Sequence, residues 1–335
     1  MLKLRRGVVV EEQPLIIEVD GERRPAWADE TLLGPMREGD AVLVNTEALD
    51  LALGSGGFDL VHANLTRGLE SGGEAGANVI KLNYTSLQHA VEPVERPEDD
   101  ASEAGRIPVL VVPLHGHLAP AAWAAAQEGG LHVGYVQTAG GALPGAISRD
   151  VVQLRERGLL RDHVTAGPAY GGSREAVSVL GALDAASTLG WQAAIVGPGP
   201  GILGSATRYG HGGMTALDSA HAALALQMPT LLAPRLSEGD PRQRHRGLSH
   251  HTATVLGLLL GEVQIPVPAD EPALAASLEQ AAGGRHRLSA HAVNLDGYGG
   301  SGLPRTTMGR DLEQDRVFFK APLAAGAALA RAAAG

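Results

Sequence analysis

The chain contains no cysteine, and aromatic residues make up only 3% of its 335 residues. Without cysteine it can form no disulfides, thiolate metal ligands, iron–sulfur clusters or cysteine nucleophile. The scarcity of aromatic side chains leaves few surfaces on which nucleic-acid bases could stack. We therefore expect a protein of a reducing compartment, the cytoplasm, and we do not expect a nucleic-acid partner.

Long apolar runs are also missing. No run approaches the roughly 18 apolar residues of a membrane span, and residues 1–7 lack the apolar core of a signal peptide. The formal net charge of −10 opposes non-specific binding to anionic membranes and to phosphate backbones. We expect no membrane partner.

The length favours two domains, because 335 residues exceed the usual size of a single core. Residues 1–92 predict a small all-β, barrel-like domain, since short strands such as 15–19 are separated by turn signals and residues 58–65 alternate apolar with polar side chains. Residues 93–106 have the composition of a linker. Residues 107–335 repeat strand, turn and helix, which predicts a doubly wound, mostly parallel α/β sheet.

Five short apolar runs of the second domain end in glycine- or histidine-rich turns or in an arginine- and histidine-rich stretch. In an open parallel sheet such turns gather at the carboxyl edge, where ligands bind. The expected strands are residues 109–112, 133–136, 163–165, 193–196 and 230–233, followed by 263–267 and 287–291. The expected helices are residues 118–127, 147–157, 174–188, 215–227, 249–260, 272–282 and 312–334. The last helix is rich in alanine, and we expect it to pack on the sheet or to form a homodimer contact.

The glycine-rich turn at residues 197–204 follows one of these strands. It contains the G-x-G-x-x-G spacing as Gly199, Gly201 and Gly204, which lets a backbone approach a phosphate closely. A dinucleotide site also needs a helix that begins inside the motif and an acidic residue about 20 positions on, and both are missing. Another anion cradle or a purely structural turn fits better. The side chains that would assist an anion are Ser205, Thr207 and Arg208.

The densest polar stretch of the chain is the segment 235–251. Ser249 is the predicted N-cap of the following helix, which puts His250 and His251 in its first turn. The positive end of a helix favours neutral imidazole, which can act as a base or bind a metal. The same corner holds three cations that attract an anion, namely Arg242, Arg244 and Arg246. The alternative is a solvated basic loop that precedes a capped helix.

Two further histidines, His115 and His117, follow the first strand of this domain. Residues two apart in an extended chain point the same way, so both rings could face one ligand. With His250 they make the candidate set for a divalent metal, and a carboxylate could come from Asp150, Asp240 or Asp311. Acid/base or hydrogen-bonding histidines are the other interpretation. The segment 306–311 is expected to return to the same edge.

Four segments together resemble a bacterial family catalogued as domain of unknown function 3866. They are residues 140–144 (GGALP), 197–201 (GPGPG), 245–252 (HRGLSHHT) and 306–310 (TTMGR), the last followed by Phe318 and Phe319. The resemblance spans nearly the whole chain. It implies that these segments belong to one unit, and it assigns no activity, cofactor or catalytic residue.

These observations predict an enzyme, a hydrolase or group transferase, that acts on a small anionic, phosphorylated substrate. The turn at 197–204 with its flanking side chains, together with the arginines and Ser249, would hold the anion. The four histidines would act as acid/base groups or metal ligands: His115, His117, His250 and His251. The alternative is a regulatory module that binds a nucleotide or similar anion without turnover.

Overall fold

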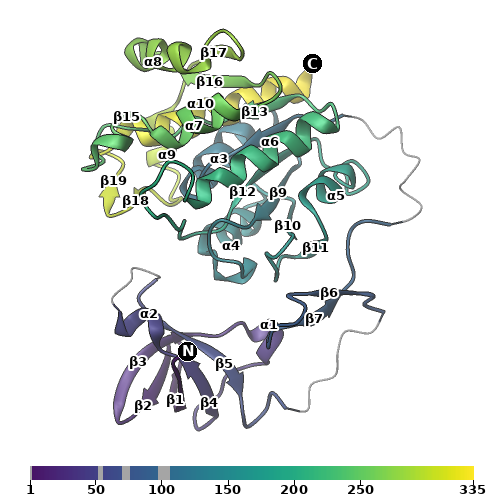
Figure 1. Ribbon diagram of the computed structural model, residues 1–335, viewed down its shortest axis with the longest axis vertical. Helices are drawn as coiled ribbons and strands as arrows, with labels where there is room; N and C mark the ends of the chain where they lie inside the picture. The colour runs from purple at the N-terminus through teal and green to yellow at the C-terminus, as the bar shows by residue number, and fades with distance from the viewer. Residues whose placement is uncertain (1, 52–55, 70–75, 97–105) are drawn as a thin grey trace. The chain divides into compact units, whose positions relative to one another are not determined.

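The computed structural model describes residues 2–51, 56–69, 76–96 and 106–335. The chain forms two compact units, residues 1–76 and 77–335 (Figure 1). The first unit has a single small hydrophobic core, and the second has a core on each side of its sheet.

The first unit is a closed five-stranded barrel with strand order β1-β2-β3-β5-β4. Its strands are β1 (Leu4–Glu12), β2 (Leu15–Val19), β3 (Glu22–Trp27), β4 (Ala41–Asn45) and β5 (Asp59–Asn64), with two short helices, α1 (Glu30–Leu33) and α2 (Glu47–Asp50). Neighbouring strands are antiparallel except β3 and β5, whose parallel pairing closes the barrel. Alternate residues such as Val42 and Val44 point into the core. The predicted small β domain is confirmed.

The boundary between the units lies after Gly76 rather than after residue 92. A hairpin of β6 (Val79–Lys81) and β7 (His89–Val91) belongs to the second unit. Its anchor is the buried ammonium group of Lys81, which donates to the carbonyl oxygens of Thr165, at 2.8 Å, and Ala169, and pairs with Glu175 at 2.7 Å. The alternating pattern of β6 suits a barrel strand equally well, and contacts of this kind assign the hairpin to the second unit.

The first residues of the predicted linker, 93–106, form hydrogen bonds with the second unit. The backbone N–H of Val94 donates to the carbonyl oxygen of Glu175, and the Glu95 carboxylate accepts from the backbone N–H of Val177. Residues 97–105 lie outside the described part of the chain. The first residues of the expected linker therefore extend the hairpin's attachment to the sheet.

The second unit is an α/β sheet of eight parallel strands in the order β11-β10-β9-β12-β8-β13-β16-β17. The strands are β8 (Val109–Val111), β9 (Val133–Thr138), β10 (Asp162–Ala166), β11 (Arg174–Ala176), β12 (Ala193–Pro198), β13 (Thr230–Leu232), β16 (Gln264–Pro268) and β17 (Arg287–His291). All six residues of β9 and of β12 are buried, as expected for a parallel sheet that is covered on both faces. The predicted architecture is confirmed.

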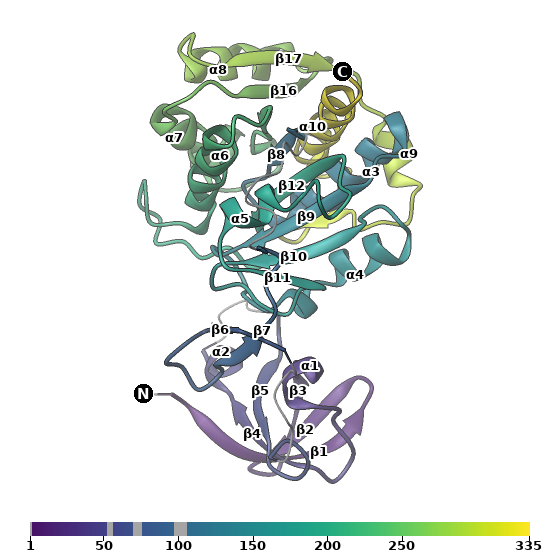
Figure 2. The same cartoon turned by 90° about the vertical axis from the view of Figure 1, so that its right-hand side faces the viewer.

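Helices cover both faces of this sheet (Figure 2). One face packs against α3 (Leu118–Gly129), α4 (Arg149–Glu156) and α10 (Arg316–Ala334). The other face packs against α5 (Val179–Asp184), α6 (Thr215–Ala225), α7 (His250–Leu258) and α8 (Pro272–Ala282). Within β8, Val109 and Val111 belong to one core and Leu110 to the other, which is the period-two alternation of a strand.

One predicted helix is wrong. Residues 174–188 begin as the edge strand β11, and the helix α5 that follows is only six residues long. Parallel pairing of β11 with β10 places Glu175 opposite Thr165, whose hydroxyl donates to the Glu175 carboxylate at 2.8 Å. A local helical pattern is thus overridden by pairing at the sheet edge.

The C-terminal helix α10 packs closely against α3 in the same unit. A Cβ atom added at Gly326 would lie 2.1 Å from the carbonyl oxygen of Ala121, so only glycine permits this approach. The helix is long and apolar enough to cross a membrane, but 72% of its most apolar window is buried inside the unit. Core packing thus accounts for its apolar character, as in water-soluble α/β folds.

Two glycine substitutions test the packing of the second unit. In Gly134→Ala, the new Cβ would lie within 2.2 Å of the Trp191 ring, and we expect the free energy of unfolding to fall by about 1–3 kcal/mol. In Gly257→Ala, on α7, a Cβ meets nothing within 4 Å, and we expect a gain of about 0.5–1 kcal/mol. Urea denaturation measures both. Equal effects of the two changes would contradict this account.

Candidate functional site

A pocket of about 450 Å³ lies at the carboxyl ends of β8, β9, β12 and β13. The chain leaves β8 and β9 for helices on one face of the sheet, and it leaves β12 and β13 for helices on the other face. The loops diverge at this switch point and leave a hollow between them. The lining residues are Leu114–Gly116, Asp150, Pro200–Gly204, Ala206, Thr207, His211, Arg235, Arg242, Arg244, His245, His250, His251 and Thr306–Met308.

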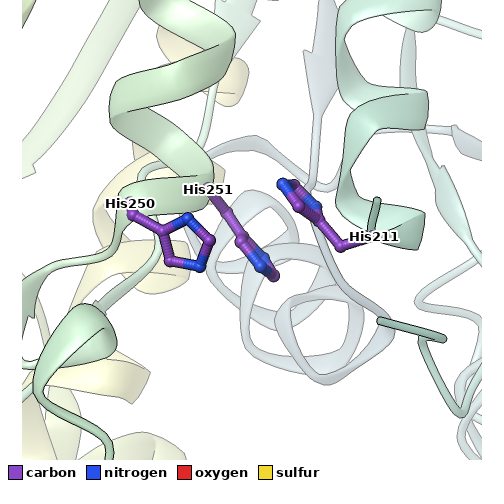
Figure 3. Close-up of side chains that lie close together, drawn as sticks. All are labelled: His211, His250 and His251. Carbon is purple, nitrogen blue, oxygen red and sulfur yellow. The ribbon is translucent and has the colours of Figure 1, made fainter. Parts of the chain in front are cut away.

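Four histidine rings meet in the wall of this pocket. His211 precedes α6, His245 ends the short 3-10 turn η5 (Gln243–His245), and His250 and His251 begin α7. The rings of His211 and His251 are stacked, with centroids 3.5 Å apart and planes 7° from parallel. His250 lies 4.4 Å from His251 and 4.9 Å from His245 between ring centroids. Figure 3 shows His251 between His211 and His250.

Ser249 positions two of these rings. Its hydroxyl accepts from the backbone N–H of His251 at 3.3 Å, which is the predicted N-cap. The same oxygen lies 2.8 Å from Nδ1 of His245. Ser249 is fully buried and does not line the pocket, so it holds the histidines in place and is not available to an anion.

The buried carboxylate of Asp240 gathers the arginines behind the pocket. The guanidinium group of Arg242 donates two hydrogen bonds to it, of 2.9 and 2.8 Å, and the backbone N–H of Arg242 donates a third at 3.0 Å. Arg235 donates to it at 3.3 Å. Arg310 lies 3.8 Å away. Burial alone would raise the pKa of Asp240, but the hydrogen bonds and charge of Arg242, with the charge of Arg235, hold the pKa well below its usual range. The carboxylate therefore stays ionised and orients its cations.

The four clustered histidines are neutral at neutral pH. Burial is the largest cause and lowers the pKa of each ring, and the positive charge of Arg235 lowers it further. For His245 these causes bring the pKa to about 3. The sequence predicted neutral rings for His250 and His251 from the helix end, whereas burial and arginine charge are the causes here.

The predicted pair His115 and His117 does not converge on one ligand. Residues 115–117 form a 3-10 turn, η2, and successive residues in such a turn point about 120° apart. His115 lines the pocket, but its Nε2 lies 2.7 Å from Oγ of Ser148 and its Nδ1 lies 3.3 Å from the carbonyl oxygen of Pro198. His117 is fully buried against Phe318 and does not line the pocket. The extended-chain argument was wrong here.

The predicted anion-binding residues divide into two groups. Gly201, Gly204, Thr207, Arg242 and Arg244 line the pocket. Gly199, Ser205, Arg208, Arg246 and Ser249 do not.

Three of the residues that do not line the pocket either pack against backbone or are exposed to solvent. At Gly199 a Cβ would lie 2.3 Å from the carbonyl oxygen of Ala142, so this glycine serves backbone packing. Arg208 is exposed and stacks over Tyr209, and Arg246 is exposed. Of the three glycines of the motif, Gly201 and Gly204 line the pocket and Gly199 does not.

Of the three carboxylates proposed as metal ligands, only Asp150 lines the pocket. Asp240 is occupied by arginines, and Asp311 lines a separate hollow with Asp296 and Glu313. The predicted return of the segment 306–311 is confirmed for Thr306–Met308, which form part of the pocket wall.

Sequence reasoning did not select three of the histidines and arginines that line the pocket: His211, His245 and Arg235. Arg235 and His245 lie inside the polar stretch 235–251, so its density of charge was a usable signal. His211 lies in a glycine-rich loop that follows β12, with no motif to mark it. Only the packing of this loop against α7 reveals its part in the cluster.

The burial of His117 leads to a test of acid stability. Burial, with a smaller effect of Arg235, lowers its pKa in the folded state to about 3 from an ordinary value of 6.5. The unfolded chain therefore binds a proton that the folded chain does not as pH falls below about 6.5. The contribution of neutral His117 to the free energy of unfolding is therefore fully present above about pH 6.5 and is lost as the pH falls towards 3.

We expect His117→Leu to reduce the loss of stability between pH 7 and pH 5, by at most about 1.4 kcal/mol per pH unit. Urea denaturation at several pH values measures this slope. The control is His132→Gln, at an exposed position that precedes β9. An unchanged slope in His117→Leu would contradict the prediction.

A family described as proteins of unknown function (DUF3866) matches residues 25–326 of the chain. This range includes all the residues of the pocket. In the barrel it includes β4, β5 and the end of β3, and it begins after β1 and β2. Neither the curated proteins nor the solved structures contain a match to the chain. Because the match covers far more than half of the sequence, the chain belongs to the DUF3866 family.

Proposed function

We propose that the protein is an enzyme, a hydrolase or group transferase, that acts on a small anionic, phosphorylated molecule in this pocket. The observation that carries the proposal is the placement of neutral imidazole rings beside arginine side chains in one hollow. The pocket volume of about 450 Å³ suits a small molecule.

The local charge supports an anionic ligand. Arg235, Arg242 and Arg244 line the pocket, against one lining carboxylate, Asp150, and the buried Asp240 behind them. Guanidinium groups bind phosphate oxygens in pairs of parallel hydrogen bonds. The second unit also carries little of the protein's negative charge. Residues 1–76 hold 7 Lys and Arg and 14 Asp and Glu, so they account for −7 of the net charge of −10.

A nucleic-acid partner is not part of the proposal. The excess negative charge of the first unit opposes binding to a phosphate backbone. The partner we propose is a small molecule, and the location we propose is the cytoplasm, on the absence of cysteine. A homodimer stays a prediction, and since α10 is mostly buried in its own unit, such a contact would need another surface.

The neutral state of the histidines favours an enzyme over a simple anion receptor. Protonated rings would add charge to a receptor, but burial and the arginines keep these rings unprotonated. An unprotonated nitrogen can take a proton from an attacking hydroxyl group or bind a metal ion. Arginines beside it can stabilise the charge that builds up on a transferring phosphoryl group.

Two neighbouring arginines provide a matched test of anion binding. Arg244 lines the pocket, whereas Arg246 is exposed outside it. We expect Arg244→Gln to weaken the binding of inorganic phosphate or pyrophosphate about 10-fold or more, because a charge-assisted hydrogen bond is lost. Arg246→Gln should leave the affinity within about 2-fold of the parent, since long-range charge effects are screened by salt. Calorimetric titration measures both, and equal losses would contradict the assignment of the pocket.

Catalysis is tested with His250→Gln. We expect turnover of the phosphoester or nucleotide that the parent protein hydrolyses or transfers to fall by at least about 10²-fold. Phosphate affinity, measured on metal-free protein, should be retained. A screen of phosphoesters, nucleotides and acyl compounds identifies the parent activity. Phosphate binding without turnover of any of these compounds would instead establish a non-catalytic regulatory module.

A further inference from the structure

The nitrogen atoms of His211, His250 and His251 lie close enough to share one cation. One nitrogen from each ring lies within 4.8 Å of the others. Ligand nitrogens of a tetrahedral zinc ion with bonds of 2.0–2.1 Å lie about 3.3 Å apart, so the rings must turn to bring their nitrogens closer together. His211 lies in the loop that precedes α6, and His250 and His251 lie in the first turn of α7 (Figure 3). All three residues line the pocket.

Two of these nitrogens are buried without a hydrogen-bond partner. Nε2 of His211 lies 3.1 Å from the carbonyl oxygen of Arg208, and since a carbonyl only accepts, Nε2 carries the proton. The lone pair of His211 is therefore on Nδ1, which has no partner, and Nε2 of His250 has none either. A ligating histidine usually donates its second N–H to a carbonyl or carboxylate, as His211 does. Buried ring nitrogens without a hydrogen-bond partner are costly, and binding to a metal ion would satisfy both.

Gly213 leaves room beside two of the rings. A Cβ atom added there would lie 3.1 Å from Nδ1 of His211 and 3.2 Å from Nδ1 of His251. A side chain at this position would therefore press against both rings. Its absence leaves the rings free to turn towards an ion.

The positively charged side chain of Arg235 lies next to the ring of His251. The guanidinium of Arg235 donates to Nδ1 of His251 at 3.3 Å, but its own Nε has no partner. A metal ion would take its place at His251, and Arg235 would keep its bond to Asp240. The parallel stacking of His211 on His251 would also have to open, because the lone pairs of stacked rings do not converge on one point.

We propose that His211, His250 and His251 bind a transition-metal dication of the kind that neutral imidazole favours, with zinc as the probe. This deepens the proposed function, since the ion would face the same pocket. When bound, such an ion supplies Lewis-acid polarisation of a phosphoryl oxygen or a more acidic water. Three protein ligands with the remaining position open to the pocket is the usual arrangement of a catalytic zinc site.

The arginines make the binding of metal and anion mutually dependent. Arg235, Arg242 and Arg244 repel a bare dication, and a phosphate between them would offset that repulsion. Phosphate should therefore strengthen zinc binding, and zinc should strengthen phosphate binding by the same factor.

The test uses the full chain after dialysis against a chelator. Zinc chloride is titrated calorimetrically in a non-coordinating buffer, and Co²⁺ absorption reports the coordination geometry. We expect one ion per chain, and losses of at least about 100-fold in affinity for His211→Gln, His250→Gln and His251→Gln, since even loss of an outer hydrogen bond costs 10–100-fold. The control is His132→Gln, an exposed histidine that precedes β9, at the amino end of the sheet.

Gly213→Ala tests the same site without removing a ligand. Its Cβ contacts require only a small adjustment of the two rings, so the chain should fold, and we expect zinc affinity to fall about 10-fold or more. If a glutamine variant does not fold, the zinc affinity of Gly213→Ala still tests the proposed site.

The proposal is overturned if the parent protein binds no zinc at one ion per chain. It is equally overturned if the three glutamine variants and Gly213→Ala keep the parent affinity. Phosphate binding that requires Arg244 without any zinc binding would remove the metal site and leave the proposed function standing. Zinc binding as expected without any phosphate binding would support the metal site and contradict the proposed function.

Discussion

The buried carboxylate of Asp240 is the interaction on which the pocket depends. It holds Arg235 and Arg242 at the carboxyl edge of the sheet, and Arg310 approaches it from a segment near the end of the chain. A buried carboxylate without such partners would be protonated or would destabilise the fold. Arg310 itself pairs with Asp315 at 3.0 Å. Because Arg235 and Arg242 share one anion, positive charge is left over for the pocket, and that charge helps to keep the nearby histidines neutral.

The parallel sheet supplies the second requirement, a common meeting point. The chain leaves β12 and β13 on one face and β8 and β9 on the other, so their loops separate at the centre of the sheet. His211 lies in the loop after β12, and His251 lies beyond the long loop that follows β13. The two rings stack although they are 40 positions apart in the sequence. The cluster is thus a product of topology and not of local sequence.

Much of the fold could be predicted because its signals are local. Continuous apolar runs predicted the buried strands, and the strand β17 and the helix α8 begin and end at the predicted residues. The failures occur where distant contacts decide the outcome. Residues 174–176 form a strand because they pair with β10, and the hairpin of β6 and β7 belongs to the second unit because Lys81 reaches carbonyl oxygens near the end of β10.

The sequence by itself determined that histidines, arginines and glycine-rich turns would gather at the carboxyl ends of parallel strands, and that Ser249 would cap a helix with two histidines in its first turn. Those features depend on hydrophobic patterning and on the backbone of one helix end, which neighbouring residues control. Only the tertiary structure decided that His115 is engaged by Ser148 and Pro198 and that His117 is buried in the core. It also decided that His211 completes the cluster. The direction of a side chain after a strand depends on the exact turn and on what packs against it, and neither can be inferred from residue spacing.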